Sequence, residues 1–313
     1  MLTDIRLFFK YRLYTPFLIF KSLKFYLYFI FDGVKLRFDQ TLNGTERPQV
    51  QNIDLNYLGK VYTWCLSAPR IDFFCGGKMT RPVIVALDLD NEEKLHEILS
   101  KLGKPENVFI KVGMELFYNA GIDVVKKLAD QGYKIFLDLK MHDIPNTVYN
   151  GAKALAKLGI TFTTVHALGG SQMIKAAKDG LIAGTPAGKS VPKLLAVTEL
   201  TSISDDVLAH EQNCSLPMDK QVLSLAKMAK NSGADGVICS PLEVKELHEA
   251  IGDDFLYVTP GIRPKGNAKD DQSRVATPAD AKAWGSSAIV VGRPITLASD
   301  PEAAYEAIKK EFN

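Results

Sequence analysis

The clearest chemical signal in this sequence is a set of four charged residues, two lysines and two aspartates. Asp138 and Lys140 stand two positions apart in the run FLDLKMHDIPNT, at the end of an apolar stretch typical of a buried strand. Alternate residues of a strand point to the same side, so both charges can face one ligand. Asp143 follows this strand, and Lys111 ends another apolar stretch. Alternating lysines and aspartates stabilise one another's ionised forms, so we predict a charged catalytic array of these four residues.

A cluster of solvated salt bridges is the alternative interpretation of these charges. Charged side chains are rarely placed at the inner end of a buried strand without partners. The pattern therefore favours a site over a surface cluster.

Two further runs are typical of phosphate binding and of a closing loop. In VVGRP (290–294), Gly292 permits close backbone approach and the forked donors of Arg293 can hold phosphate oxygens. A plain turn with a surface arginine is the alternative. The run TPGIR (259–263) contains Arg263 and precedes a long polar loop up to Arg274. Such a loop suits a lid over a ligand, with an uninvolved surface loop as the alternative.

The elements that must position these residues alternate between strand and helix. Eight apolar runs of strand type occupy residues 83–88, 108–112, 134–139, 161–166, 193–197, 236–239, 255–259 and 288–291. Amphipathic helical patterns follow them near residues 91–102, 122–131, 146–158, 171–181, 221–231, 242–250, 278–284 and 301–311. Continuous apolar strands indicate a parallel sheet that is buried on both faces. Eight such units predict an α/β fold of the (β/α)8 TIM-barrel type.

A doubly wound open sheet is the alternative fold, but it usually carries a Gly-rich first turn. Here the first strand ends in Asp88-Leu89-Asp90, which gives no support to a dinucleotide site. In a barrel, chemistry belongs to the polar residues at the carboxyl ends of the strands. Those positions hold Asp88, Lys111, Asp138, Lys140, His166, Thr201, Ser240, Arg263 and Arg293. Spacing places His166 and Cys239 in no nucleophilic set, so we expect both to pack.

Composition excludes several classes of protein. Hydrophobic residues make up 46% of the chain and charged residues 24%, which rules out a disordered or collagen-like chain. The formal net charge of +2 gives no reason to expect a nucleic-acid partner. The four cysteines show no Cys-x-x-Cys spacing, so we expect no metal site and a reducing, cytoplasmic environment.

Residues 1–78 differ in composition from residues 79–313, which we expect to form the whole barrel domain. The first segment holds 17 of the 29 aromatic residues and carries 11 Lys and Arg against 6 Asp and Glu. Its apolar stretch 13–31 contains Lys21 and Lys24, which argue against a membrane-spanning helix and leave an interfacial helix open. We expect this extension to lie outside the barrel, with little membrane contact, and hypothesise that Met79 is the natural start.

Taken together, the motifs resemble the bacterial orotidine 5′-phosphate decarboxylase family. The resemblance runs from Arg81 to Phe312 and rests on VALDLD, FIKVGMELF, FLDLKMHDIPNT, VHALGG, VTELTS, VTPGIR and VVGRPIT, in family order. It implies cofactor-free, metal-free decarboxylation of orotidine 5′-phosphate to UMP, with Lys140 as proton donor. It also implies that Asp138 lies beside the substrate carboxylate and that Lys111 completes the array.

The resemblance implies binding roles as well. Asp88 would bind ribose hydroxyls, and Thr201 would contact the pyrimidine. The phosphate would be bound by Arg263, Gln272, Gly292 and Arg293, with Gln272 on the closing loop. Asp143 and Thr147 would reach the neighbouring site of a homodimer.

Two other functions remain open at this point. One is a metal-dependent sugar-phosphate lyase on the same barrel. Lyases of that kind resemble enzymes that have a carboxylate where this chain has Lys111, and a lysine repels Mg²⁺ rather than binding it. The other is a non-catalytic nucleotide-binding or membrane-associated protein anchored by residues 1–78.

Overall fold

The computed structural model describes residues 26–31, 34–39, 81–265 and 275–313. The chain divides into two units, Met1–Ala68 and Pro69–Asn313. In the first, β1 (Tyr26–Phe31) and β2 (Val34–Asp39) pair antiparallel. Aromatic and β-branched side chains favour this extended backbone. Residues 26–31 therefore form a strand rather than the end of an interfacial helix, and the rest of stretch 13–31 lies outside the described residues.

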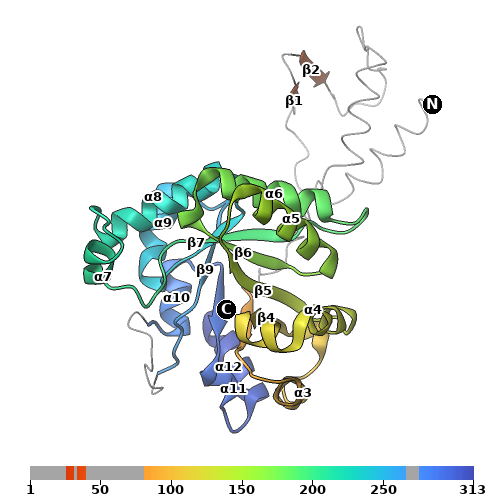
Figure 1. Cartoon of the computed structure of the whole chain (residues 1–313). Helices are drawn as coiled ribbons and strands as arrows, with labels where there is room; N and C mark the ends of the chain where they lie inside the picture. Colours follow the sequence, from red (N-terminus) through yellow and green to blue (C-terminus); the bar gives the residue numbers. More distant parts are fainter. Residues whose placement is uncertain (1–25, 32–33, 40–80, 266–274) are drawn as a thin grey trace, which may run out of the picture. The chain divides into compact units, whose positions relative to one another are not determined.

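The second unit is a closed barrel of eight parallel strands, in the order β10-β3-β4-β5-β6-β7-β8-β9 (Figure 1). The strands are β3 (Val83–Leu87), β4 (Phe109–Gly113), β5 (Lys134–Met141), β6 (Phe162–His166), β7 (Lys193–Val197), β8 (Gly236–Ile238), β9 (Leu256–Thr259) and β10 (Ala288–Val291). Every predicted strand is present, so the (β/α)8 TIM-barrel prediction is confirmed. β1 and β2 take no part in this barrel.

Helices follow the strands around the barrel (Figure 1). They are α3 (Glu92–Ser100), α4 (Met114–Asp130), α5 (Pro145–Leu155), α6 (Gly170–Gly184), α7 (Asp205–His210), α8 (Met218–Asn231), α9 (Val244–Ile251), α10 (Pro278–Trp284), α11 (Arg293–Thr296) and α12 (Pro301–Phe312). Short 3₁₀ turns are η1 (Pro105–Asn107), η2 (Ala156–Leu158), η3 (Ala167–Gly169) and η4 (Pro241–Glu243). The sequence did not predict the short helices α7 and α11.

Helix α4 begins at Met114, earlier than the predicted start at Ile122. Gly121 has a φ of 73° inside it, so a kink separates the first half from the second. The predicted helix corresponds to the part after this kink, where one apolar face is continuous.

Alternation along the strands divides the core into an inner and an outer layer. Phe109, Phe136 and Phe162 point into the barrel and pack there with other buried strand residues. Their neighbours along each strand point outward and pack against the helices. The inward set continues by twos to Lys111, Asp138 and Thr164, which brings polar residues to one end of an apolar interior.

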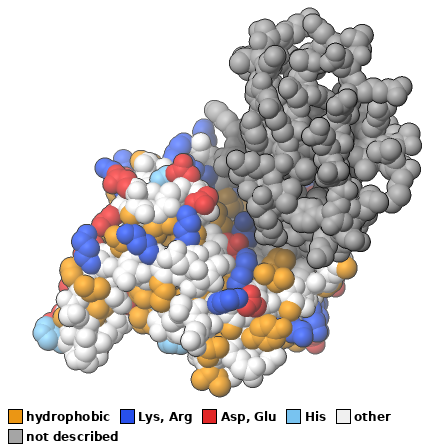
Figure 2. All heavy atoms as spheres, turned by 90° about the horizontal axis from the view of Figure 1, so that it is seen from above, with side chains coloured by type: hydrophobic (Ala, Val, Ile, Leu, Met, Phe, Trp, Pro, Cys, Tyr) orange, Lys and Arg blue, Asp and Glu red, His pale blue; other side chains and the backbone are white. Residues whose placement is uncertain are grey.

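The surface is mixed in character. Figure 2 shows acidic, basic and apolar side chains interspersed over the described part of one face. No helix in the described part of the chain has the length and apolar character needed to cross a bilayer.

Candidate active site

A cavity of about 530 Å³ lies at the carboxyl ends of the barrel strands. This is the end at which a parallel barrel presents its βα loops, and polar side chains there are free to meet a ligand. The cavity brings together eight of the predicted site residues: Asp88, Lys111, Asp138, Lys140, Thr201, Arg263, Gly292 and Arg293.

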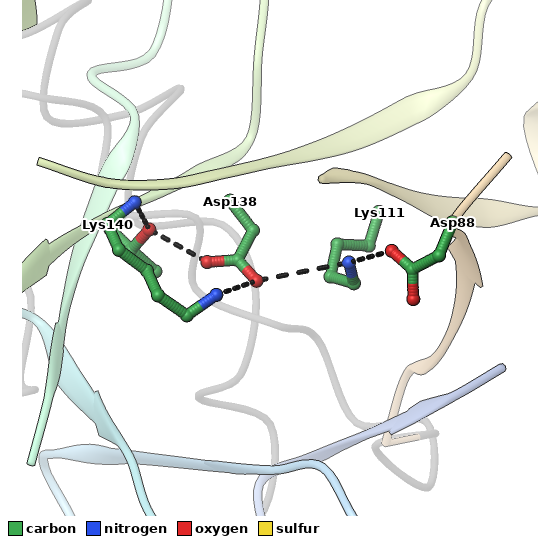
Figure 3. A network of polar contacts seen from close by, with 5 residues as sticks. Asp88, Lys111, Asp138 and Lys140 are labelled. Carbon is green, nitrogen blue, oxygen red and sulfur yellow. Dashed lines mark hydrogen bonds and ion pairs between the residues drawn. The ribbon is translucent and has the colours of Figure 1, made fainter. Parts of the chain in front are cut away.

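Two lysines converge on the carboxylate of Asp138 (Figure 3). The ammonium of Lys140 donates to Asp138 Oδ2 at 2.9 Å, and Lys111 Nζ lies 3.9 Å from the same oxygen. Lys111 also donates to Asp88 Oδ1 at 2.8 Å. Four charges of alternating sign thus form one line along the cavity wall, from Lys140 through Asp138 and Lys111 to Asp88.

Burial differs along this line of charges. The side chains of Lys111 and Asp138 are each only 11% exposed, whereas those of Asp88 and Lys140 are 58% and 27% exposed. A buried ion needs a partner to offset its desolvation. The inner pair therefore needs its neighbours, while Lys140 and Asp88 remain accessible to a ligand.

Lys140 lies in a bulge of strand β5. Leu137 pairs with Thr163 and Met141 with Val165, so residues 138–140 stand opposite Thr164 alone. Lys140 has a φ of 49°, a left-handed backbone that is uncommon outside glycine. Asp138 and Lys140 share a side of the strand as predicted, but the bulge rather than regular alternation places them there.

Gly113 makes room for the ion pair between Asp88 and Lys111. A Cβ at this glycine would lie 2.9 Å from Asp88 Oδ1 and 2.9 Å from Lys111 Nζ. Both distances are shorter than a carbon atom tolerates. Gly113 was not predicted from the sequence, although it lies two positions beyond Lys111 and therefore on the same side of β4.

The opposite part of the cavity carries the arginines and the glycine of the predicted phosphate site. Arg263 is 8% exposed, and its guanidinium donates to the carbonyl of Ile262 at 3.0 Å. An isolated β-bridge pairs Ile262, which precedes the predicted lid, with Ala276, which follows it. Gln272 and most of that lid, residues 266–274, lie outside the described residues.

Several predicted residues do not line the cavity. Asp143 and Thr147 are exposed, and the Asp143 carboxylate accepts from the amide of Ile144. Ser240 is buried and caps the turn η4.

His166 was expected to pack, and its ring stacks on that of His142, with the ring centroids 5.6 Å apart. Burial lowers the pKa of His166, and the charges of His142 and Lys140 lower it further. Its Nδ1 is buried without a hydrogen-bond partner in the described structure.

A buried glutamate in the cavity wall was not predicted from the sequence. Glu199 is 2% exposed and accepts from the side-chain amides of Gln212 and Gln221 at 3.4 and 3.3 Å. These contacts tie the end of β7 to the segment before α8 and to α8 itself. Its place two residues after the end of β7 is the signal that could have identified it.

Within the described residues, no three or more histidine, cysteine, aspartate or glutamate side chains gather into a set able to hold a metal ion.

The chain is similar to proteins of known family. Residues 81–308 match the model of the orotidine 5′-phosphate decarboxylase / HUMPS family. An orotidine 5′-phosphate decarboxylase from Lactobacillus acidophilus is 89% identical over 235 residues, which cover 75% of this chain and 100% of that protein. One from Lactobacillus gasseri is 81% identical over 235 residues, with the same shares covered, 75% and 100%.

A solved structure gives the same result. The crystal structure of orotidine 5′-phosphate decarboxylase from Lactobacillus acidophilus matches with a TM-score of 0.69 and 85% identity. The match covers 74% of this chain and 99% of that one.

Proposed function

The chain belongs to the orotidine 5′-phosphate decarboxylase / HUMPS family, and we propose that the charges around Asp138 carry out its chemistry. The reaction is the decarboxylation of orotidine 5′-phosphate to UMP, a step of pyrimidine biosynthesis. The observation that supports this use of the site is the convergence of Lys140 and Lys111 on Asp138 in the cavity wall.

The reaction requires the protein to stabilise a negative charge that develops on C6. When the bond between C6 and the carboxylate breaks, CO2 leaves and the electron pair stays on C6. No adjacent π-system accepts that pair, so its charge must be stabilised electrostatically. A fixed ammonium in a water-poor site supplies such stabilisation and can then donate its proton.

Lys140 is assigned as this ammonium. Its proton passes to C6 to give UMP, and the neutral amine then regains a proton from water. Asp138 lies beside the substrate carboxylate, and Lys111 neutralises Asp138 so that the aspartate stays buried and charged. No metal or organic cofactor takes part in this proposal.

The remaining cavity residues hold the nucleotide. Asp88 binds ribose hydroxyls and Thr201 contacts the pyrimidine. The phosphate is bound by Arg263, Gly292 and Arg293, together with Gln272 from the loop beyond the described residues. Binding energy from a phosphate remote from the reacting carbon can organise the charged array.

The direct test is the fall in absorbance when orotidine 5′-phosphate is added to the purified chain. The wild-type chain should consume the substrate, whereas Lys140→Ala should lose turnover and still bind UMP in calorimetry. Turnover close to wild type in Lys140→Ala would contradict the assignment of Lys140.

A metal-dependent sugar-phosphate lyase is the second function to separate, since the family model covers the HUMPS group as well. Lys111 in β4 bonds to Asp88 and would repel a divalent cation at that place. Activity on orotidine 5′-phosphate should therefore persist in EDTA. Loss of activity in EDTA, with recovery on adding Mg²⁺, would favour the lyase.

Asp143 and Thr147 suit a second copy of the chain. Both are exposed outside the cavity, and Ile144 between them is 67% exposed, an unusual position for a large apolar side chain. We propose a homodimer in which these two residues complete the neighbouring site, in the cytoplasm as the cysteine pattern predicts.

Mixing two inactive variants tests this arrangement. Lys140→Ala and Asp143→Ala should each be inactive alone. If Asp143 crosses the interface of a two-fold dimer, random exchange of subunits restores about one quarter of the sites. A mixture that stays inactive after demonstrated subunit exchange would place Asp143 in its own subunit's site.

A further inference from the structure

The bulge in β5 interrupts the ladder at the residues that carry the charges. Residues 138–140 face Thr164 alone on β6, and Lys140 takes a left-handed backbone with a φ of 49°. A lysine in this conformation needs surrounding contacts to hold it there. The amide of Lys140 also needs an acceptor, since regular pairing stops at this point.

The hydroxyl of Thr164 meets both needs. Thr164 is fully buried, and its Oγ1 accepts from the backbone N–H of Lys140 at 2.9 Å. The same hydroxyl donates to Asp138 Oδ1 at 2.9 Å. A hydroxyl has one proton to donate and lone pairs to accept, so these two bonds use it without conflict.

The two bonds fix complementary parts of the array. The bond from Lys140 N–H anchors the backbone from which the ammonium extends. The bond to Asp138 Oδ1 orients the carboxylate, which leaves Oδ2 facing Lys140 Nζ at 2.9 Å and Lys111 Nζ at 3.9 Å. One side chain therefore sets the position of both partners in the central ion pair.

We propose that Thr164 is a positioning residue for decarboxylation, which holds Lys140 and Asp138 in their reactive arrangement through this single hydroxyl. The proposal rests on the proposed function of these two residues. Thr164 touches neither substrate nor the reacting carbon in this role; it acts through the groups that do.

The adjacent residue on β6 provides a matched comparison. Thr163 is equally buried, but its hydroxyl has no hydrogen-bond partner in the described structure. A threonine on this strand therefore does not need its hydroxyl for the sheet itself. Loss of the hydroxyl from Thr163 should affect neither the bulge nor the array.

The test compares Thr164→Val, Thr164→Ser and Thr163→Val in the full chain. Valine keeps the shape of threonine and removes the hydroxyl, so Thr164→Val should lower kcat about 10- to 100-fold, as small misplacements of reacting groups do. Its KM and its affinity for UMP should change by less than about threefold, because uniform binding is untouched. Thr164→Ser should recover most of kcat, and Thr163→Val should match wild type.

Each outcome separates this proposal from the proposed function. Wild-type turnover reports on the function, and the ratio of variant to wild-type kcat reports on Thr164. An unchanged kcat in Thr164→Val, or a rise in KM with kcat unchanged, would overturn the positioning role while the function stands. If Thr164→Val does not fold, the ratio between Thr164→Ser and Thr164→Ala decides, and equal kcat values for those two would overturn it.

Discussion

The carboxylate of Asp138 is the centre of the charge balance in this site. Its oxygen Oδ2 faces both Lys140 and Lys111, and Asp88 balances the second lysine, so these four charges within one copy of the chain sum to zero. A substrate carboxylate beside Asp138 adds one unbalanced negative charge. Departure of neutral CO2 leaves that charge on C6, and the Lys140 proton then neutralises C6. Uptake of a proton by the Lys140 amine restores the neutral array, so the array is better matched to the product than to the substrate.

His166 should contribute to the loss of stability at acid pH. Its pKa lies below the ordinary 6.5 because it is buried beside His142 and Lys140. As the pH falls below about 6.5, the unfolded chain takes up this proton before the folded chain does, so stability falls. His166→Asn should therefore lose less of its thermal midpoint between pH 7.5 and pH 5.5 than wild type loses.

The control for this prediction is His96→Asn, at an exposed position on α3. That variant should keep the wild-type loss of midpoint over the same pH range. An equal loss in His166→Asn and wild type would show that other groups govern acid stability.

At the scale of elements, α5 and α6 pack closely enough to exclude a methyl group. A Cβ at Gly180 on α6 would lie 2.3 Å from the carbonyl oxygen of Tyr149 on α5. Alanine would gain about 1 kcal/mol of helix propensity. Forcing the helices apart costs about 1–3 kcal/mol, and a backbone oxygen cannot rotate away, so we expect the cost to prevail.

Gly180→Ala should therefore lower the thermal midpoint by a few degrees, at about 2–4 °C per kcal/mol for a domain of this size. Gly151→Ala on α5 is the matched control, because its Cβ would meet only Met141 Sδ, at 3.7 Å. That variant should be as stable as wild type or slightly more stable. A rise in midpoint for both variants would contradict close packing between these helices.

At the scale of the whole molecule, the sequence predicted what depends on local pattern. Apolar runs identified all eight strands, and strand ends identified seven residues of the cavity, with Gly292 added by the VVGRP motif. Thr164 and Gly113 were missed because their roles depend on a neighbouring strand or on the space left for an ion pair. The bulge at Lys140 was missed for the same reason, since two extra residues in β5 leave no mark on its hydrophobic pattern.

The barrel should work without residues 1–78. Asn313 donates from its side chain to the carbonyl of Arg81 at 3.1 Å, so the two ends of the described barrel hold each other. The 235 matched residues also cover 100% of the Lactobacillus acidophilus relative. Met79–Asn313 should therefore fold, with kcat/KM for orotidine 5′-phosphate within about twofold of the full chain, because every cavity residue is retained. Circular dichroism and the absorbance assay on both chains test this expectation, and a folded but inactive Met79–Asn313 would assign residues 1–78 a part in catalysis.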